Sequence, residues 1–242
     1  RDAQESRGLG DVYKRQIIRS DIMEPKMFCF QCQETAGNKG CMFGGVCGKK
    51  PETANLQDLL IYVTKGLSEI TTRLRSEGKE IPAAIDRLIT TNLFMTITNA
   101  NFDDDRFIDR INETLSSRDE LFEQLHDDTG LSDAASWQYR TAEERTLKAD
   151  KVGVLDTGNE DLLSLRELTL YGLKGMAAYN KHANVLGYAD TAIDAFLQKA
   201  LAKTLDDSLS TDDLTSLVLE TGSFGVKVMA LLDTANTSTY GN

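Results

Sequence analysis

Apolar side chains recur at helical spacing along the chain after Pro51. The clearest stripe advances in steps of three or four residues, which keeps its members on one face of an α-helix. It consists of Leu56, Leu60, Val63, Leu67, Ile70 and Leu74. Gly78 predicts where this helix ends and Pro82 where the next one opens, because Gly suits the position after a helix and Pro suits a first turn.

The same spacing predicts helices over most of the remaining chain. An acidic run at Asp103–Asp105 indicates a helix N-terminus, where the helix dipole favours carboxylates. Ser210 and Asp213 form a capping-box pattern that predicts another start. We expect Gly172 and Gly175, inside a long helix, to allow close packing against a neighbour. The predicted helices after the first cover residues 85–96, 103–125, 141–150, 162–183, 191–205 and 221–232, with a break at 127–140.

No segment alternates between apolar and polar residues as a strand would, so the fold class predicted is all-α, built as two three-helix-type bundles. The piece SRGLGDVYKRQ near the start reads as a translated adapter rather than as protein, and the last residues have the composition of a turn. The expected domains are a non-native or disordered extension (1–26), a cysteine loop (27–50), a first bundle (51–127), a second bundle (128–236) and the start of a linker that is cut within a larger protein (237–242).

Composition narrows the class of protein. The 242 residues are 40% hydrophobic and carry a net charge of −11, which disfavours binding to nucleic acid or to an anionic membrane. No uninterrupted apolar run approaches the roughly 18 residues that span a bilayer, and the first residues of the sequence form no apolar core of the kind a signal peptide has. We therefore expect a cytoplasmic, monomeric protein with neither a membrane nor a nucleic acid as partner.

All four cysteines lie close together near the start of the chain, in the pattern Cys29-x2-Cys32-x8-Cys41-x5-Cys47. Two thiolates on one tight turn can bind one metal centre, and the next two can complete a set of four ligands. Glycine permits left-handed dihedral angles, which lets a loop fold around a centre and point N–H groups at sulfur. The glycines in this loop are Gly37, Gly40, Gly44, Gly45 and Gly48.

The spacing leaves three kinds of site open. Structural zinc sites usually have two short Cys-x2–4-Cys knuckles far apart in the sequence, whereas here the second pair is Cys-x5-Cys in the same compact loop. Disulfides are disfavoured in a cytosolic chain. The spacing therefore favours an iron–sulfur cluster over zinc, and zinc over disulfides. Lys39, Lys49 and Lys50 would offset part of the cluster's negative charge, and four protein ligands would leave no open position for a substrate, which suits electron transfer.

At residues 27–50, which include MFCFQCQETAGNKGCMFGGVCGK, the sequence resembles the hybrid cluster protein family, also called hydroxylamine reductase or prismane protein. The likeness continues at TANLQDLLIYVTKGLS (53–68), LTLYGLKGMAAYNKHA (168–183) and VKVMALLDTANTSTYGN (226–242). The resemblance implies a [4Fe–4S] cluster held by Cys29, Cys32, Cys41 and Cys47. It also implies an all-helical first domain followed by two α/β domains that this chain lacks.

The family chemistry implied is the reduction of hydroxylamine to ammonia and water, with nitric oxide as a further substrate. It takes place at a second, hybrid iron–sulfur–oxygen cluster, whose histidine, glutamate and cysteine ligands lie in the later domains. Since this chain has no cysteine after Cys47, we name no catalytic residue. The expected function is the electron-relay domain of an oxidoreductase, inactive alone, with an electron donor protein and a small nitrogen substrate as partners of the intact protein. The alternative is a helical binding module stapled by zinc or by a cluster, without catalysis.

Overall fold

The computed structural model describes residues 25–32, 34–97, 101–156 and 158–241. The all-α prediction is confirmed: these residues form seven α-helices and no strand. The helices are α2 (Pro51–Ser76), α3 (Ala83–Ile97), α4 (Asp104–Phe122), α5 (Ala142–Ala149), α6 (Glu160–Val185), α7 (Thr191–Lys203) and α8 (Thr211–Tyr240), with short 3₁₀ turns at Ala36–Asn38, Asp133–Ala135 and Val154–Asp156. The predicted extension over residues 1–26 lies almost entirely outside the described residues.

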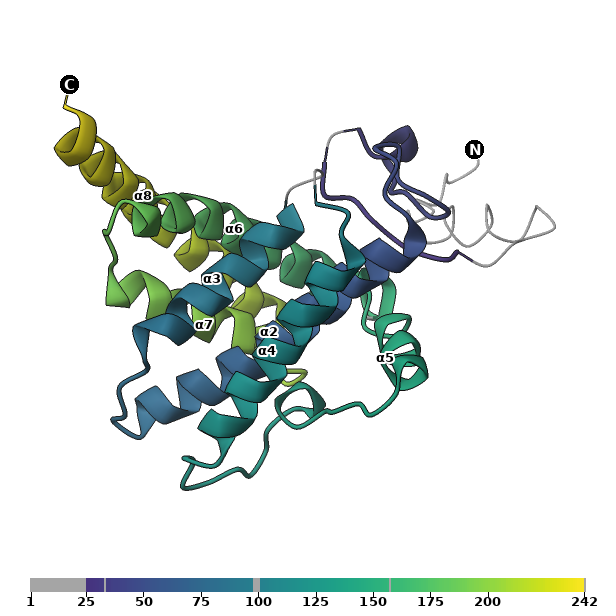
Figure 1. Cartoon of the computed structure of the whole chain (residues 1–242), viewed down its shortest axis with the longest axis horizontal. Helices are drawn as coiled ribbons and strands as arrows, with labels where there is room; N and C mark the ends of the chain where they lie inside the picture. The colour runs from purple at the N-terminus through teal and green to yellow at the C-terminus, as the bar shows by residue number, and fades with distance from the viewer. Residues whose placement is uncertain (1–24, 33, 98–100, 157, 242) are drawn as a thin grey trace, which may run out of the picture.

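Helix α2 lies at the centre of the molecule and packs against α3, α4, α5 and α7, while α6 packs against α3 and α8 (Figure 1). Its predicted apolar stripe is buried along its whole length. The first half of the stripe packs with Phe107, Ile111 and Leu115 of α4. The second half belongs to a larger core. That core takes residues from α3, α6, α7 and α8 as well, including Leu93, Leu173, Leu197 and Leu217.

The proposed division into bundles at 51–127 and 128–236 stays a prediction, and the larger core crosses that boundary. Contacts between α2 and α7 and between α3 and α6 join the two halves of the chain. Side chains of the larger core on both sides of the boundary, among them Leu93, Leu173 and Leu197, are buried. We therefore describe the helices as one packed unit on which the cysteine loop sits.

The helix starts read from the sequence are confirmed by their caps. The side chain of Asp103 accepts a hydrogen bond from the Arg106 N–H at the start of α4, and Ser210 and Asp213 form the predicted capping box of α8. Of the two glycines expected at a close contact, only Gly172 lies at one. A Cβ atom there would stand 2.9 Å from the Thr221 methyl group on α8, whereas one at Gly175 would meet nothing within 4 Å.

The end of the chain differs from the prediction. Residues 237–240, expected as a turn and the start of a linker, continue α8 to Tyr240. Gly241 then caps the helix with a φ of +81°, and its N–H donates to the Thr237 carbonyl. Thr, Ser and Asn have turn-like composition, but an exposed final helical turn accommodates them because their side chains face water.

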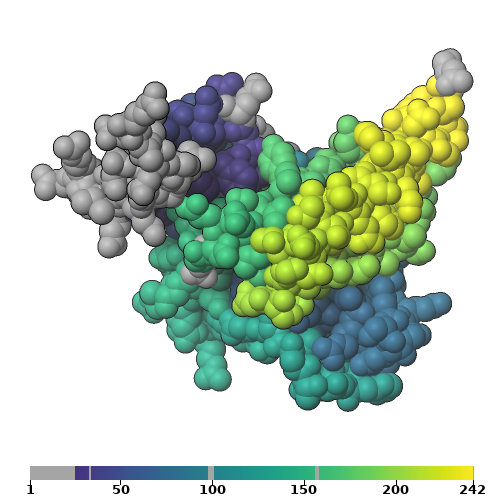
Figure 2. Space-filling view, turned by 180° about the vertical axis from the view of Figure 1, so that it is seen from behind, coloured from purple at the N-terminus to yellow at the C-terminus, as the bar shows by residue number. Residues whose placement is uncertain are grey.

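Helix α8 also changes the expectation about membranes. Small and hydroxyl residues interrupt its apolar runs, yet its most apolar window has a mean hydropathy of 1.3, so by length and composition alone the helix could cross a bilayer. Only 22% of that window is buried in the structure. Figure 2 shows α8 lying across the surface, with its C-terminal end projecting from the rest of the molecule. This is weak evidence for a membrane span, and it identifies α8 as an exposed apolar helix.

Candidate metal centre

The cysteine loop lies beside the N-terminal end of α2 (Figure 1). An isolated antiparallel bridge aligns Cys29 with Cys41: each N–H donates to the other residue's carbonyl, over 3.0 and 2.8 Å. Gly40 makes this pairing possible, because its φ is +118° and a Cβ atom there would lie 2.4 Å from the Phe28 ring. The first and third cysteines are thus held side by side by backbone geometry.

Two further turns position the other cysteines. The N–H of Thr35 donates to the Cys32 carbonyl over 3.2 Å. Cys47 lies between Gly45 and Gly48, whose N–H group donates to the Gly45 carbonyl over 2.9 Å. The sulfur of Cys47 would lie 3.1 Å from a Cβ atom at Gly45. The missing side chain at Gly45 therefore leaves room for a sulfur atom close to the backbone.

Backbone N–H groups, the Thr35 hydroxyl and the charge of Lys49 act on the sulfur of Cys41. Burial raises the pKa of this thiol, but N–H groups of Val46 and Ala36, the Thr35 hydroxyl and the charge of Lys49 outweigh that effect, so the pKa lies below its ordinary value. The Thr35 hydroxyl oxygen is 3.7 Å from the Cys41 sulfur. Because thiolate is the form that binds metals, this environment favours a metal ligand over an inert buried thiol.

Lys49 contributes a buried positive charge to the loop. Its side chain is 2% exposed, and its ammonium group donates to the Cys29 sulfur over 3.8 Å and to the Gln57 Oε1 atom over 2.7 Å. Among the three lysines expected to offset a cluster's charge, Lys49 donates a hydrogen bond to a cysteine sulfur. Its second contact joins the loop to α2.

The loop is joined to α6 as well. The hydroxyl group of Tyr171 donates to the Gln31 carbonyl over 3.3 Å, and the Tyr171 ring stacks on Phe30 with centroids 6.4 Å apart. On the outer side of the loop, Phe43 and Val46 are more than half exposed. The loop therefore has an anchored inner side and an apolar outer side.

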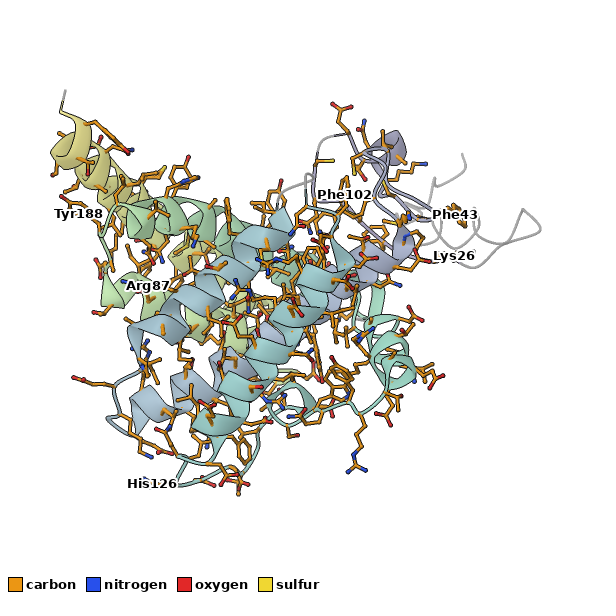
Figure 3. The ribbon with its side chains drawn as sticks, viewed as in Figure 1. Lys26, Phe43, Arg87, Phe102, His126 and Tyr188 are labelled. Atoms are coloured by element: carbon orange, nitrogen blue, oxygen red, sulfur yellow. The ribbon has the colours of Figure 1, made fainter. Side chains whose placement is uncertain are left out.

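The two histidines of the chain do not lie beside the cysteines. His126 follows α4 and lies at the opposite end of the molecule from Phe43 of the loop (Figure 3), where its N–H donates to Glu77. His182 on α6 packs edge-on against Phe94. All four cysteines are free thiols. Among the described residues, no three Cys, His, Asp or Glu side chains are gathered closely enough to hold a single metal ion.

The sequence did not point to Thr35 or Gln57 as part of this site. Thr35 has no motif of its own within the loop, and its role depends on the turn that brings it back to Cys29 and Cys41. Gln57 is eight residues from Lys49, and their contact depends on how the loop enters α2. Neither spacing is a recognisable sequence signal.

Comparisons with known proteins all point to one protein family. A profile of the Prismane/CO dehydrogenase family matches residues 27–242. A protein named hydroxylamine reductase from Desulfovibrio desulfuricans is 61% identical over 220 residues, which are 91% of this chain and 40% of that protein. Proteins of the same name from Clostridium perfringens and Acetivibrio thermocellus are each 53% identical over 89% of this chain and 40% of their own length. The chain thus spans about 40% of the length of these curated relatives.

Proposed function

The chain belongs to the Prismane/CO dehydrogenase family, and we propose that it is the electron-relay part of a hydroxylamine reductase. In this proposal Cys29, Cys32, Cys41 and Cys47 hold one [4Fe–4S] cluster. When bound, such a cluster accepts and passes on single electrons. The intact protein would reduce hydroxylamine to ammonia and water, and nitric oxide is a second candidate substrate.

The observation that carries the proposal is the environment of the thiols. N–H groups and the Thr35 hydroxyl face the Cys41 sulfur, and the Lys49 ammonium faces the Cys29 sulfur. Hydrogen bonds and positive charge at sulfur stabilise the thiolate form and help set the reduction potential of a cluster.

Electron entry would use the outer side of the loop. Phe43 is 53% and Val46 is 62% exposed, and they flank the segment that leads to Cys47. An exposed apolar pair next to a redox centre suits brief contact with an electron donor protein, because transient redox interfaces are small. We therefore expect the donor to dock on this side, and we expect the intact protein to act in the cytoplasm.

The first experiment measures metal and acid-labile sulfide in the anaerobically purified chain. We expect a brown protein with about four iron and four sulfide per chain, as four-thiolate ligation of a cubane requires. Stoichiometric zinc without sulfide would refute the iron–sulfur proposal and support a metal-stapled binding module instead. A Cys32→Ala variant serves as a control that should lose most of the iron.

The second experiment tests the relay role. Dithionite should reduce the bound cluster, because outer-sphere electron transfer needs no ligand exchange, yet the chain should not convert hydroxylamine to ammonia. A substrate needs an iron atom with an open position, and four cysteines occupy the positions that a cubane offers. The full-length protein should turn over and should slow when Cys32 is replaced. Ammonia formation by this chain at the full-length rate would overturn the relay role.

A further inference from the structure

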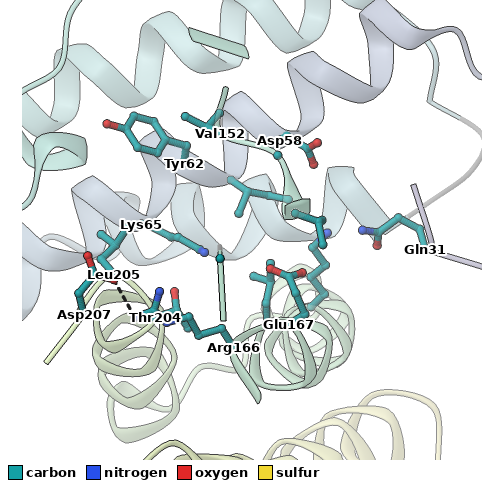
Figure 4. A pocket seen from close by; sticks show the side chains of 16 residues that line it. Gln31, Asp58, Tyr62, Lys65, Val152, Arg166, Glu167, Thr204, Leu205 and Asp207 are labelled. Atoms are coloured by element: carbon teal, nitrogen blue, oxygen red, sulfur yellow. Dashed lines mark hydrogen bonds and ion pairs between the residues drawn. The ribbon is translucent and has the colours of Figure 1, made fainter. Parts of the chain in front are cut away.

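A charged cavity of about 440 Å³ lies behind the cysteine loop, between α2, α6 and the segments that precede α6 and follow α7. Figure 4 shows Gln31 at one side of it and Asp207 at the opposite side, with Asp58, Lys65 and Glu167 between them. Gln31 lies in the turn between Cys29 and Cys32. The cavity therefore reaches from the metal-binding loop to a surface aspartate, which is 93% exposed at its side chain.

Helices α2 and α6 and the segment after α7 contribute charge to the cavity. The charged groups on its wall are Asp58 and Lys65 from α2, Arg166, Glu167 and Lys174 from α6, and Asp207 after α7, with Lys49 and Cys29 of the loop within electrostatic range. Arg166 donates to Asp207 over 2.9 Å at the outer end. Groups of both signs thus line the cavity.

Several buried polar atoms on this wall have no hydrogen-bond partner among the described residues. They are the Lys174 ammonium, the Nε atom of Arg166 and the Oε1 atom of Gln31. Lys174 is only 1% exposed. Buried polar groups nearly always find a partner, and a polar space of this size can hold several bridging waters. These three orphaned atoms indicate a hydrated path from the outer end of the cavity to the loop.

The charges of the cysteine loop act on two charged groups of the cavity, Lys174 and Asp58. The negative charge of Cys29 and the positive charge of Lys49 both act on Lys174, and Lys49 also acts on Asp58. An electron added at the loop would add negative charge there, and negative charge favours binding of a proton nearby. The placement of Asp58 and Lys174 thus connects the redox state of the loop with protonation in the cavity.

We propose that the Asp58–Lys174 pair is a proton-binding site that takes up one proton from water when the cluster at the cysteine loop is reduced. The step balances: a one-electron reductant gives one electron to the cluster, and solvent gives one proton, through the hydrated cavity, to the carboxylate or the amine of the pair. This inference rests on the proposed function, because it needs a redox centre at the loop. It adds a role for residues outside the cysteine motif.

The electrostatics of the pair agree with this role. Burial raises the pKa of Asp58 well above its usual range, against the opposing charge of Lys174. Burial lowers the pKa of Lys174, against the opposing charge of Asp58. The raised pKa of the carboxylate and the lowered pKa of the amine lie closer to each other and to neutral pH than their ordinary values do. The pair can therefore exchange a proton with water near neutral pH.

The test is a redox titration of the cluster-loaded chain at several pH values, followed by the electron paramagnetic resonance of the reduced cluster. We expect the midpoint potential to fall as pH rises through the neutral range, by up to about 59 mV per pH unit, the value for one proton per electron. The double variant Asp58→Asn/Lys174→Met removes both charges, keeps the net charge and should make the potential independent of pH. Replacing a buried ion pair by neutral side chains of similar size is often tolerated.

A matched control removes an ion pair that joins α2 to α3. Arg75 contacts Asp86 over 2.7 Å, and it lies 17 residues beyond Asp58, about 25 Å along the helix. The variant Arg75→Met/Asp86→Asn should keep the pH dependence of the parent. If the double variant at the cavity loses its cluster, Asp58→Asn alone should move the pH dependence to lower pH, because the amine loses the carboxylate that holds its proton.

The possible outcomes separate this inference from the proposed function. A chain that binds no iron–sulfur cluster overturns both. A cluster that is reduced by dithionite with a potential that ignores pH overturns this inference and leaves the relay intact. A pH dependence that survives unchanged in the cavity variants also overturns it, because another group must then bind the proton.

Discussion

Gly66 of α2 lies directly beneath the backbone carbonyl of Ala134: a Cβ atom at Gly66 would stand 1.9 Å from that oxygen. The 3₁₀ turn Asp133–Ala135 therefore rests on the bare backbone of the central helix. The same carbonyl accepts a hydrogen bond from Arg118 of α4, whose side chain is completely buried. One glycine thus allows a loop to approach two helices at once.

We expect Gly66→Ala to destabilise the chain by about 3 kcal/mol, the upper end for overpacking, because the neighbour is backbone and cannot rotate away. Gly175→Ala is the matched control, since it adds the same methyl group to a helix interior where nothing lies within 4 Å. It should stabilise the chain by up to about 1 kcal/mol. Urea unfolding followed by circular dichroism measures both, and equal effects would contradict the close approach at Gly66.

Lys49→Met should lower the reduction potential of the cluster. Reduction adds negative charge beside the Lys49 ammonium, so loss of this buried cation destabilises the reduced state. The midpoint potential should fall by roughly 50–100 mV, the order expected for one unit charge in a partly buried setting. Lys50→Met is the control, because Lys50 is exposed and water and salt screen its charge. A redox titration compares the two. Equal shifts, or a rise for Lys49→Met, would argue against direct action of Lys49 at the loop.

Cys41→Ala should remove the cluster and leave most of the helical circular dichroism. The helices build two apolar cores of their own, whereas the loop contributes a separate small cluster around Met27, Cys41 and Ala54. Iron content and the signal at 222 nm measure the two effects in one sample. Global unfolding of this variant would mean that the metal centre, rather than these cores, holds the helices together.

Asp194 gives the chain a pH-dependent stability. Burial raises the pKa of Asp194 to about 6, although a hydrogen bond from Asn180 opposes the rise. The folded state then binds this proton more tightly than the unfolded state, so its contribution to stability is complete at low pH and is lost as pH rises from about 4 through 6. Asp194→Asn keeps a carbonyl oxygen that accepts from Asn180 and has no proton to lose.

Between pH 4 and pH 7 the free energy of unfolding of Asp194→Asn should rise relative to the parent by about 2 kcal/mol. Urea titrations of both proteins at each pH measure this difference, and acid effects shared by the two chains cancel in it. A difference that stays constant with pH would show that Asp194 does not titrate in this range.

Much of the fold follows from local sequence patterns. The stripe of α2 is buried as predicted because its spacing matches the helical repeat, and α4 begins where Asp103 caps it. The end of α8 was predicted wrongly, because Thr, Ser and Asn suit both a turn and an exposed helix end. Gly66 gave no signal, since a glycine within a helical pattern does not reveal what approaches it.

For the candidate site, the four cysteines could be identified from their spacing, and their ligation stays a prediction. The contact between Lys49 and Cys29 joins residues 20 positions apart, so it depends on the path of the loop. The cavity depends on tertiary structure even more, because Asp58 and Lys174 come from helices that are far apart in the sequence. No local pattern marks two opposite charges that line one cavity only after α2 and α6 have packed.

Helix α2 carries contacts to the loop, the cavity and the 3₁₀ turn through Gln57, Asp58 and Gly66. The helical repeat, about 100° per residue, fixes the direction of each contact around the helix axis. Inserting a single residue between Asp58 and Gly66 would rotate everything downstream by about 100° about the helix axis and advance it by about 1.5 Å. The cysteine loop, held to Gln57 through Lys49, would then be rotated relative to the core that the rest of α2 packs against. Changes in length are therefore far less tolerable here than substitutions, and α2 fixes the orientation of the cysteine loop relative to the helices.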